Sequence, residues 1–238
     1  MQAVILAAGM GTRIREIHAL PKGFIHVGEQ TLIDRSIQCL RDFGILDILI
    51  VTGFKAVCYV PLKEKYNRLQ TIFNSHYHCY SSLYSLYCAK DFISDDFLLL
   101  ESDIIYESRA IENLLNDVRA NVILLSGTTQ SSDEVYVEVL AQKLMAMSKQ
   151  KNNLREENIL GEFVGINKIS YDAYRSLIKT LKNEPSLLQK GHYEEQGLVK
   201  MAQLTDVYCL KIDDLWWGEI DNEFQLKRMQ NLHERVTE

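Results

Sequence analysis

Short apolar runs separated by amphipathic segments dominate the first half of the chain. The runs at residues 3–6, 48–52 and 97–100 predict strands buried on both faces, because an uninterrupted apolar run leaves neither face polar. Residues 30–43 place apolar side chains on one helical face, and Gly44 follows as a stop. A strand, a helix and a second strand in this order are typical of a βαβ unit in a parallel sheet.

The rest of the chain continues the alternation and then changes character near residue 133. Further strands are predicted at residues 69–73, 121–126, 161–167 and 207–212, and further helices at 60–66, 84–89, 110–119, 172–182 and 223–235. Residues 135–139 alternate like a half-buried antiparallel strand that pairs with 142–148, and 152–158 is a polar loop. We therefore expect one α/β domain over residues 1–238. It should be a three-layer sandwich with a mixed, mostly parallel central sheet and a small β-rich lid.

Composition narrows the function classes. The 238 residues carry a net charge of −6 and no basic stripe, which argues against nucleic acid as a main partner. No apolar run approaches ~20 residues, so no membrane span is expected. The N-terminus has neither the basic start nor the cleavage site of a signal peptide. The five cysteines, Cys39, Cys58, Cys79, Cys88 and Cys209, are scattered without a C-x-x-C, which predicts buried free thiols in a cytoplasmic protein.

Candidate chemistry begins in LAAGMGTRIREIHALPK, which starts at Leu6 and ends at Lys22. Its small residues allow a ligand to approach the backbone, whose N–H groups can form an anion-binding concavity. Arg13 and Lys22 add two cations, so the loop suits a polyphosphate. It is not a P-loop, and Ile14 stands where the dinucleotide fingerprint needs a third glycine. The alternative is a turn that merely packs a strand on a helix.

Two aspartates follow predicted strands. Asp103 comes just after the run at 97–100, and Asp221 lies between a late strand and the last helix. Ligands in open α/β sheets bind outside the carboxyl ends of the strands, and two carboxylates there can hold Mg²⁺. Glu101 and Glu219 are further candidates. The alternative role of each aspartate is to cap a helix N-terminus.

The pattern L-A-A-G-x-G-T-R followed by P-K resembles the nucleotidyltransferases that activate sugar phosphates and small phospho-alcohols. The resemblance implies a Rossmann-like nucleotidyltransferase fold, catalysis by Lys22, Arg13, Asp103 and Asp221, and Mg²⁺ on the two aspartates. The implied nucleotide-binding residues are Leu6, Ala7, Ala8, Gly9, Gly11, Thr12, Arg13, Lys22 and Ser82.

Further motifs look like two branches of this family. Phe73-Asn74 and Tyr84-Ser85-Leu86 look like the phosphocholine cytidylyltransferases, although Ser81-Ser82 stands where that branch usually has two asparagines. Glu101-Ser102-Asp103, the stretch 133–137, Met147-Ser148-Lys149 and Glu219-Ile220-Asp221 look more like the 2-aminoethylphosphonate cytidylyltransferases. We let this second similarity decide the expected acceptor.

The acceptor's cationic head can be recognised in two ways. Quaternary ammonium prefers an aromatic cage, whereas a primary ammonium prefers oxygen acceptors. The candidate acceptor-binding residues are Tyr84, Tyr136, Lys149, Tyr193, Glu194, Glu195 and Trp217, with Trp216 beside them. The alternatives left open are a solvated helix start for the two glutamates and core packing for the tryptophans.

The sequence thus predicts a Mg²⁺-dependent cytidylyltransferase that joins CMP from CTP to 2-aminoethylphosphonate or a close amino-phospho acceptor. No nucleic acid or membrane partner is expected. Alternatives are a phosphocholine cytidylyltransferase, a sugar-1-phosphate nucleotidylyltransferase and a non-catalytic nucleotide-sensing module. The choice of CTP over UTP and the existence of a homodimer stay open.

Overall fold

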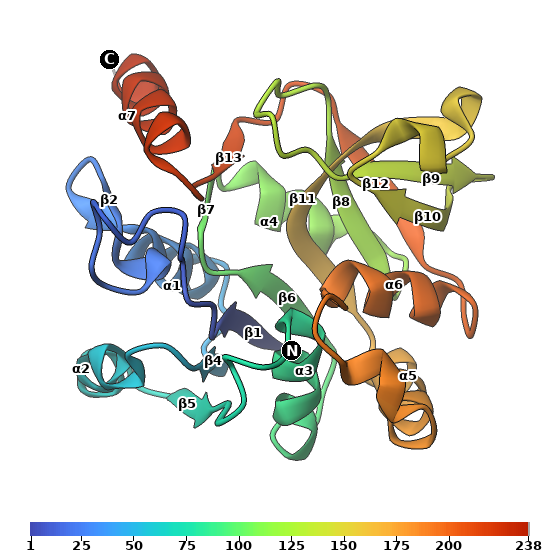
Figure 1. Ribbon diagram of the computed structural model, residues 1–238, viewed down its shortest axis with the longest axis horizontal. Helices are drawn as coiled ribbons and strands as arrows, with labels where there is room; N and C mark the ends of the chain where they lie inside the picture. Colours follow the sequence, from blue (N-terminus) through green and yellow to red (C-terminus); the bar gives the residue numbers. More distant parts are fainter. Residues whose placement is uncertain (238) are drawn as a thin grey trace.

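A nine-stranded mixed sheet forms the middle layer of the protein in the computed structural model, which describes residues 1–237 (Figure 1). Its strand order is β5-β4-β1-β6-β11-β8-β12-β10-β9. The strands are β1 (Gln2–Ala7), β4 (Ile48–Thr52), β5 (Leu69–Phe73), β6 (Phe97–Glu101), β8 (Val122–Ser126), β9 (Tyr136–Leu140), β10 (Lys143–Ser148), β11 (Ile159–Ile169) and β12 (Tyr208–Ile212). Strands β5, β4, β1 and β6 are parallel, and the other half is mainly antiparallel. The predicted mixed α/β sandwich is confirmed.

Helices cover both faces of this sheet. They are α1 (Leu32–Asp42), α2 (Val60–Lys65), α3 (Ser82–Cys88), α4 (Arg109–Asn116), α5 (Tyr171–Asn183), α6 (Glu194–Ala202) and α7 (Glu223–Thr237). Along β1, Val4 and Leu6 join the core under α3, α5 and α6, while Ala3 and Ile5 join the core under α1, α2 and α4. Because successive side chains of a strand alternate, one uninterrupted apolar run supplies both cores.

The antiparallel half of the sheet curls back on itself. Strand β9 pairs with β10 and also with the first residues of β11, so the predicted hairpin is confirmed. The hairpin also joins β12 through Lys143, opposite Tyr208. It therefore extends and closes the central sheet, and the expected β-rich lid is this curled sheet edge. Closure of this kind leaves fewer unpaired strand groups exposed.

Several element boundaries differ from the prediction for local reasons. Helix α1 begins at Leu32 because Thr31 is its N-cap and accepts a hydrogen bond from the Asp34 N–H at 3.2 Å. Helix α3 begins at Ser82 instead of residue 84, and α4 ends at Asn116 instead of 119. Strand β11 is longer than predicted, since its start pairs with β9.

Two small sheets were not predicted. Strands β2 (His26–Val27) and β3 (Gln30–Thr31) form one, and β7 (Ile104–Tyr106) and β13 (Trp217–Glu219) form the other. In the second sheet Glu219 lies opposite Ile104. This pairing brings together two segments that are far apart in the sequence, directly beside Asp103 and Asp221.

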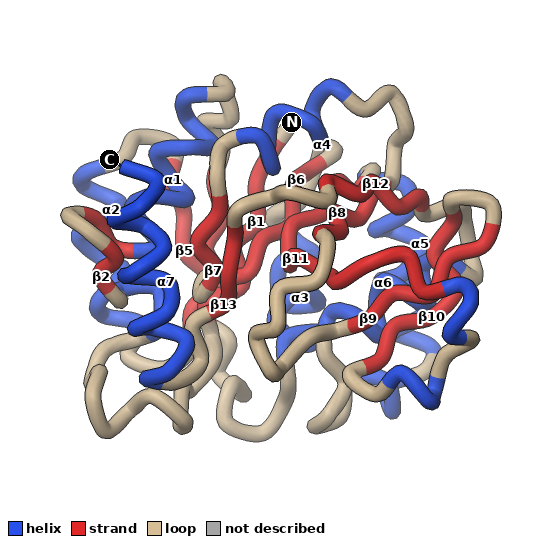
Figure 2. The backbone as a smooth tube through the Cα atoms, turned by 90° about the horizontal axis from the view of Figure 1, so that it is seen from above, coloured by secondary structure: helices blue, strands red, loops and turns tan. Residues whose placement is uncertain are grey.

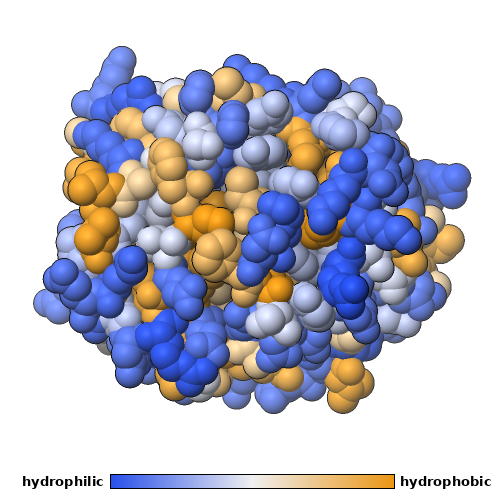
Figure 3. Space-filling model, turned by 90° about the horizontal axis from the view of Figure 1, so that it is seen from below, coloured by the Kyte–Doolittle hydropathy of each residue, from blue (hydrophilic) through white to orange (hydrophobic). Residues whose placement is uncertain are grey.

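Many of the longer loops gather along one side of the molecule, at the lower edge of Figure 2. Figure 3 shows the molecule from the side opposite to Figure 2. This surface is largely hydrophilic, with apolar side chains grouped towards its middle. Such mixed surfaces are normal for folded proteins. Among the helices of residues 1–237, none combines the length and apolar character needed to cross a bilayer.

Candidate active site

The loop after β1 forms one wall of a cavity of about 560 Å³. Leu6, Ala7, Ala8, Gly9, Arg13, Lys22 and Ser82 line it, as predicted for a nucleotide site, whereas Gly11 and Thr12 do not. Gly11 instead has φ +57° and packs against Lys22: a Cβ there would lie 3.1 Å from the Lys22 Cγ. A side chain at Gly9 would meet nothing within 4 Å, which leaves its backbone open to a ligand.

Lys22 lies between the two predicted aspartates. Its Nζ donates to Asp103 Oδ2 and to Asp221 Oδ1. Burial by itself lowers the pKa of the Lys22 ammonium, but the charges of Asp103 and Asp221 outweigh this and raise it above its ordinary value. Lys22 is therefore a permanent cation at neutral pH.

Asp221 is 2 % exposed and pairs with two cations, Lys22 and Arg13. Burial favours its neutral form, but Lys22 and the other polar contacts prevail, so the pKa of Asp221 falls to about 2. Its backbone N–H donates to Gln225 Oε1 at 2.7 Å.

Neither aspartate serves as a helix cap. Asn222 accepts from the Gln225 N–H at 3.0 Å at the start of α7, and Ser108 precedes α4. The Ile220 N–H donates to the Asp103 carbonyl at 2.9 Å, which ties the ends of β7 and β13 together. The capping alternative for Asp103 and Asp221 is thus not supported, and the small β7–β13 sheet places the two carboxylates side by side.

The donor set around these aspartates fits a hard divalent cation. Carboxylate oxygens of Glu101, Asp103 and Glu219 lie within 4.8 Å of one another, and so do those of Asp133, Glu219 and Asp221. Burial and then the charge of Asp103 raise the pKa of Glu219 well above its ordinary value. The Lys22 ammonium, held between Asp103 and Asp221, shows that this point stabilises positive charge. Oxygen ligands of this kind suit Mg²⁺.

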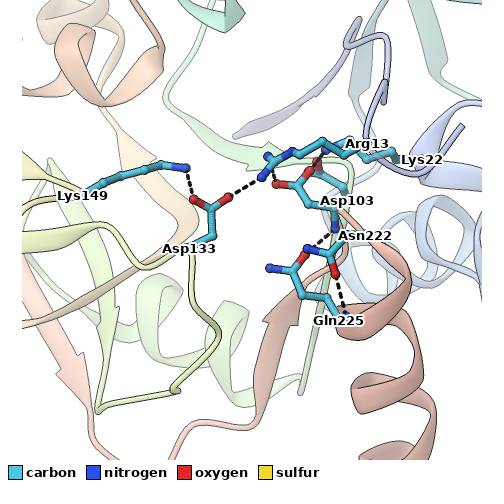
Figure 4. A network of polar contacts seen from close by, with 8 residues as sticks. Arg13, Lys22, Asp103, Asp133, Lys149, Asn222 and Gln225 are labelled. Atoms are coloured by element: carbon cyan, nitrogen blue, oxygen red, sulfur yellow. Dashed lines mark hydrogen bonds and ion pairs between the residues drawn. The ribbon is translucent and has the colours of Figure 1, made fainter.

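Asp133 is a site residue that the sequence reasoning missed. Its Oδ2 accepts from Arg13 Nη1 at 2.9 Å and its Oδ1 accepts from Lys149 Nζ at 2.6 Å. The ion pairs form a line of alternating charges: Asp103, Lys22, Asp221, Arg13, Asp133 and Lys149. Figure 4 shows Asp133 between Lys149 and Arg13. Burial favours the neutral Lys149 amine, but the Asp133 contact raises the pKa of Lys149 overall.

A second wall of the cavity carries buried carboxyl groups at the start of α6. Glu194 is 4 % exposed; its carboxylate accepts from Ser82 Oγ, and its N–H donates to the same oxygen at 3.1 Å. Burial, followed by the charge of Glu101, raises the pKa of Glu195 to about 7. Burial likewise raises the pKa values of Glu194 and Glu101. The Glu195 Oε2 atom is buried and has no hydrogen-bond partner within the described part of the chain. These glutamates are therefore not a solvated helix start.

The predicted acceptor residues divide into two groups. Lys149, Tyr193, Glu194, Glu195 and Trp217 line the cavity. The Trp217 Nε1 atom is buried and finds no hydrogen-bond partner among residues 1–237. These five acceptor candidates thus surround one cavity.

Tyr84 and Tyr136 do not line the cavity, and their prediction as acceptor residues is corrected. Ser82 and Ser85 face the cavity from α3, so Tyr84 points elsewhere and stacks on Tyr80, with ring centroids 4.5 Å apart. Tyr136 is the first residue of β9 and is absent from the cavity lining. Lys151 Nζ lies 4.4 Å from the Tyr136 ring centroid.

Comparison with known proteins places this architecture among nucleotide-using enzymes. Residues 3–161 match the family model of the MobA-like NTP transferase domain. The choline-phosphate cytidylyltransferase of Streptococcus pneumoniae is 35% identical over 109 residues, which cover 45% of this chain and 47% of that protein. The CTP:phosphoglutamine cytidylyltransferase of Campylobacter jejuni is 24% identical over 93% of this chain and 96% of its own length. The chain thus spans about half the length of the choline-phosphate enzyme that it matches.

Solved structures share the whole fold. A CTP:phosphocholine cytidylyltransferase from Streptococcus pneumoniae aligns with a TM-score of 0.80 at 22% identity, covering 98% of both chains. An inositol-1-phosphate CTP transferase from T. maritima aligns with a TM-score of 0.80 at 19% identity, over 100% of this chain and 96% of that one. At these identities the likeness establishes the fold, and the Rossmann-like α/β prediction is confirmed.

Proposed function

Because this chain belongs to the MobA-like NTP transferase family, we propose that it is a cytidylyltransferase that joins CMP from CTP to 2-aminoethylphosphonate or a close amino-phospho acceptor. Pyrophosphate is the second product. The names of the choline-phosphate and phosphoglutamine relatives support a CTP-dependent reaction on a small phospho-compound. The acceptor is inferred from the cavity itself.

The observation that carries the proposal is the presence of both kinds of charge in one cavity. Arg13, Lys22 and Lys149 line it with cations, each paired with an aspartate, and Glu194 and Glu195 line it with carboxyl groups. Cations suit phosphate groups, and a carboxylate suits a cationic head. An acceptor that carries both a phosphonate and an ammonium group matches this arrangement.

The reaction follows from the charges. A phosphonate oxygen of the acceptor attacks the α-phosphorus of CTP, and the bond from that phosphorus to the bridging oxygen of the β-phosphate breaks. The electron pair leaves on pyrophosphate, and CMP stays on the acceptor. The nucleophile is already an anion, so no general base and no covalent enzyme intermediate are required. Catalysis consists of holding the two substrates together and stabilising charge on the departing oxygens.

The chain's own cations have separate tasks in this scheme. Lys22 and Arg13 contact the triphosphate, since they flank the loop whose small residues line the cavity. Asp103 and Asp221 would hold Mg²⁺, and a bound Mg²⁺ neutralises charge on the phosphate oxygens. Lys149, which lies on the acceptor side, would bind the phosphonate.

An ammonium head is favoured over trimethylammonium by the buried carboxyl groups. A primary ammonium donates charge-assisted hydrogen bonds to carboxylates, which the methyl groups of choline cannot do. Tyr193 and Trp217 support the alternative acceptor, phosphocholine, because aromatic faces bind quaternary ammonium. A sugar 1-phosphate has no cation for Glu194 and Glu195.

Steady-state specificity constants for 2-aminoethylphosphonate, phosphoethanolamine and phosphocholine, measured by pyrophosphate release with CTP and Mg²⁺, test the choice of acceptor. We expect 2-aminoethylphosphonate to have the highest kcat/KM. A clear preference for phosphocholine would mean that the aromatic rings, and not the glutamates, recognise the head group.

A pH dependence follows from Glu195. Its carboxyl group has a pKa of about 7 in the free enzyme, so it is neutral below that pH and charged above it. Because kcat/KM reports free-enzyme pKa values, kcat/KM for the acceptor should rise between about pH 6 and about pH 8. Glu195→Gln should lower kcat/KM about tenfold at the upper end and flatten the rise, since a charge-assisted hydrogen bond is worth about 1.5–3 kcal/mol.

Titration of the acceptor affects both proteins equally. Comparing the wild type with Glu195→Gln on the same compound therefore isolates the contribution of Glu195. Superimposable pH profiles in the two proteins would show that Glu195 does not bind the cationic head.

A further inference from the structure

We propose that Asp133 is a positioning residue that holds the nucleotide-side cation Arg13 and the acceptor-side cation Lys149 at a fixed separation across the cavity. The inference rests on the proposed cytidylyltransferase function. Each oxygen of the Asp133 carboxylate accepts from a different cation: Arg13 Nη1 at 2.9 Å and Lys149 Nζ at 2.6 Å. One carboxylate thereby lies between the two cations, as Figure 4 shows.

The carboxylate is the more buried partner, and the two cations are more exposed. The Asp133 side chain is 17% exposed, whereas those of Arg13 and Lys149 are 56% and 53% exposed. Ordering a long, exposed Arg or Lys side chain costs up to about 2 kcal/mol of rotamer entropy. The contacts with Asp133 order both side chains in the free protein, so the two cations are already oriented when the substrates bind.

The loop that carries Asp133 is itself anchored. The Thr129 N–H donates to Glu162 Oε2 at 2.9 Å, the Thr129 carbonyl accepts from Arg228, and the Val135 carbonyl accepts from the Phe163 N–H at 2.8 Å. These contacts come from β11 and α7, on both sides of the loop. These contacts anchor the backbone before and after Asp133 without using the cations that Asp133 contacts.

The reaction explains why such a residue is needed. Both substrates present anionic phosphorus groups, which repel each other, and the attack is productive only when the reacting atoms are close and aligned. Two cations held on one carboxylate would bind the triphosphate and the phosphonate as neighbours. Asp133 touches neither phosphorus group in this scheme; it acts through Arg13 and Lys149.

If Asp133 only shielded the two cations, its removal would leave kcat unchanged or raise it. A carboxylate beside two anion-binding cations also weakens anion binding, because like charges repel. Removing that charge should therefore tighten the binding of anions. A positioning role also frees the two cations to move, which offsets part of this gain, and it requires that turnover falls although anion binding does not weaken.

The test is Asp133→Asn, which keeps the shape of the side chain and removes its charge. We expect kcat to fall at least about tenfold, which corresponds to about 1.4 kcal/mol. In the same protein, inorganic pyrophosphate measured by calorimetry should bind at least as tightly as in the wild type. The Asp133→Asn/Lys149→Ala double variant should be little slower than Lys149→Ala alone, because the two residues act as one unit.

The matched control is Asp206→Asn, which breaks a surface ion pair with Lys143 outside the cavity and should leave both quantities unchanged. Unchanged or increased kcat in Asp133→Asn would show that Asp133 only shields the cations and would overturn the inference. Weaker pyrophosphate binding together with a lower melting temperature would show a structural role and also overturn it. A wild type without turnover on any acceptor would instead refute the proposed function, and this inference with it.

Discussion

Replacing Asp221 with asparagine should lower turnover by about 10²–10³-fold, because loss of a metal-binding carboxylate removes several kcal/mol of charge stabilisation at the transferring phosphate. Asp221 is the more sensitive of the two aspartates, since it pairs with Lys22 and Arg13, whereas within residues 1–237 Asp103 pairs with Lys22 alone. Its carboxylate is 2 % exposed, so the substitution also leaves two cations with less compensation.

Asp103→Asn is the matched variant, and it should follow the same pattern with a smaller loss. The measurements are initial rates over a Mg²⁺ titration and the melting temperature of each protein. Both variants should fold, lose turnover and need more Mg²⁺ for half-maximal rate. Near wild-type rates in both would exclude the two-aspartate metal site.

Lys22→Ala should lower kcat by about 10²–10³-fold with a smaller change in the KM for CTP, because the charge that Lys22 meets develops as pyrophosphate leaves. The structure adds a second expectation. The Lys22 ammonium lies between Asp103 and Asp221, at the point where the two aspartates would hold a divalent cation. Lys22→Ala should therefore bind Mg²⁺ more tightly in the absence of CTP, although it turns over more slowly.

Lys143→Ala, which removes a surface lysine paired with Asp206, is the control and should behave as the wild type. Mg²⁺ affinity is read by calorimetry and kcat and KM by pyrophosphate release. An effect confined to KM would mean that Lys22 binds only the ground state. Weaker Mg²⁺ binding in Lys22→Ala would contradict the competition between the ammonium and the metal.

The strands of the parallel half could be predicted almost to the residue. The segments Ile48–Thr52 and Leu69–Phe73 are bounded apolar or β-branched runs, and local pattern alone defines them. Strands β7 and β13 could not be found in this way, because each has three residues and exists only through pairing between distant segments, such as Trp217 with Tyr106. The start of α3 at Ser82 likewise coincides with a distant contact, the hydrogen bonds to Glu194.

The site residues likewise divide into those that the local sequence identifies and those that only the fold identifies. Arg13, Lys22, Asp103 and Asp221 stand at strand ends or in a glycine-rich loop, so residue type and position marked them in advance. Asp133 lies in a polar loop where an aspartate is ordinary, and only the fold brings it to Arg13 and Lys149. Tyr84 and Tyr136 are candidates because aromatic faces bind a cationic head, but neither residue lines the cavity.

The measurement that tests the central claim most directly is the identification of the product formed from CTP, Mg²⁺ and 2-aminoethylphosphonate. Phosphorus NMR and mass spectrometry of the wild-type reaction should show CMP joined to the phosphonate and one pyrophosphate for each molecule of product. Omission of the acceptor or of Mg²⁺ should abolish both. Release of CMP without a conjugate, or no consumption of CTP with this acceptor, phosphoethanolamine or phosphocholine, would contradict the account.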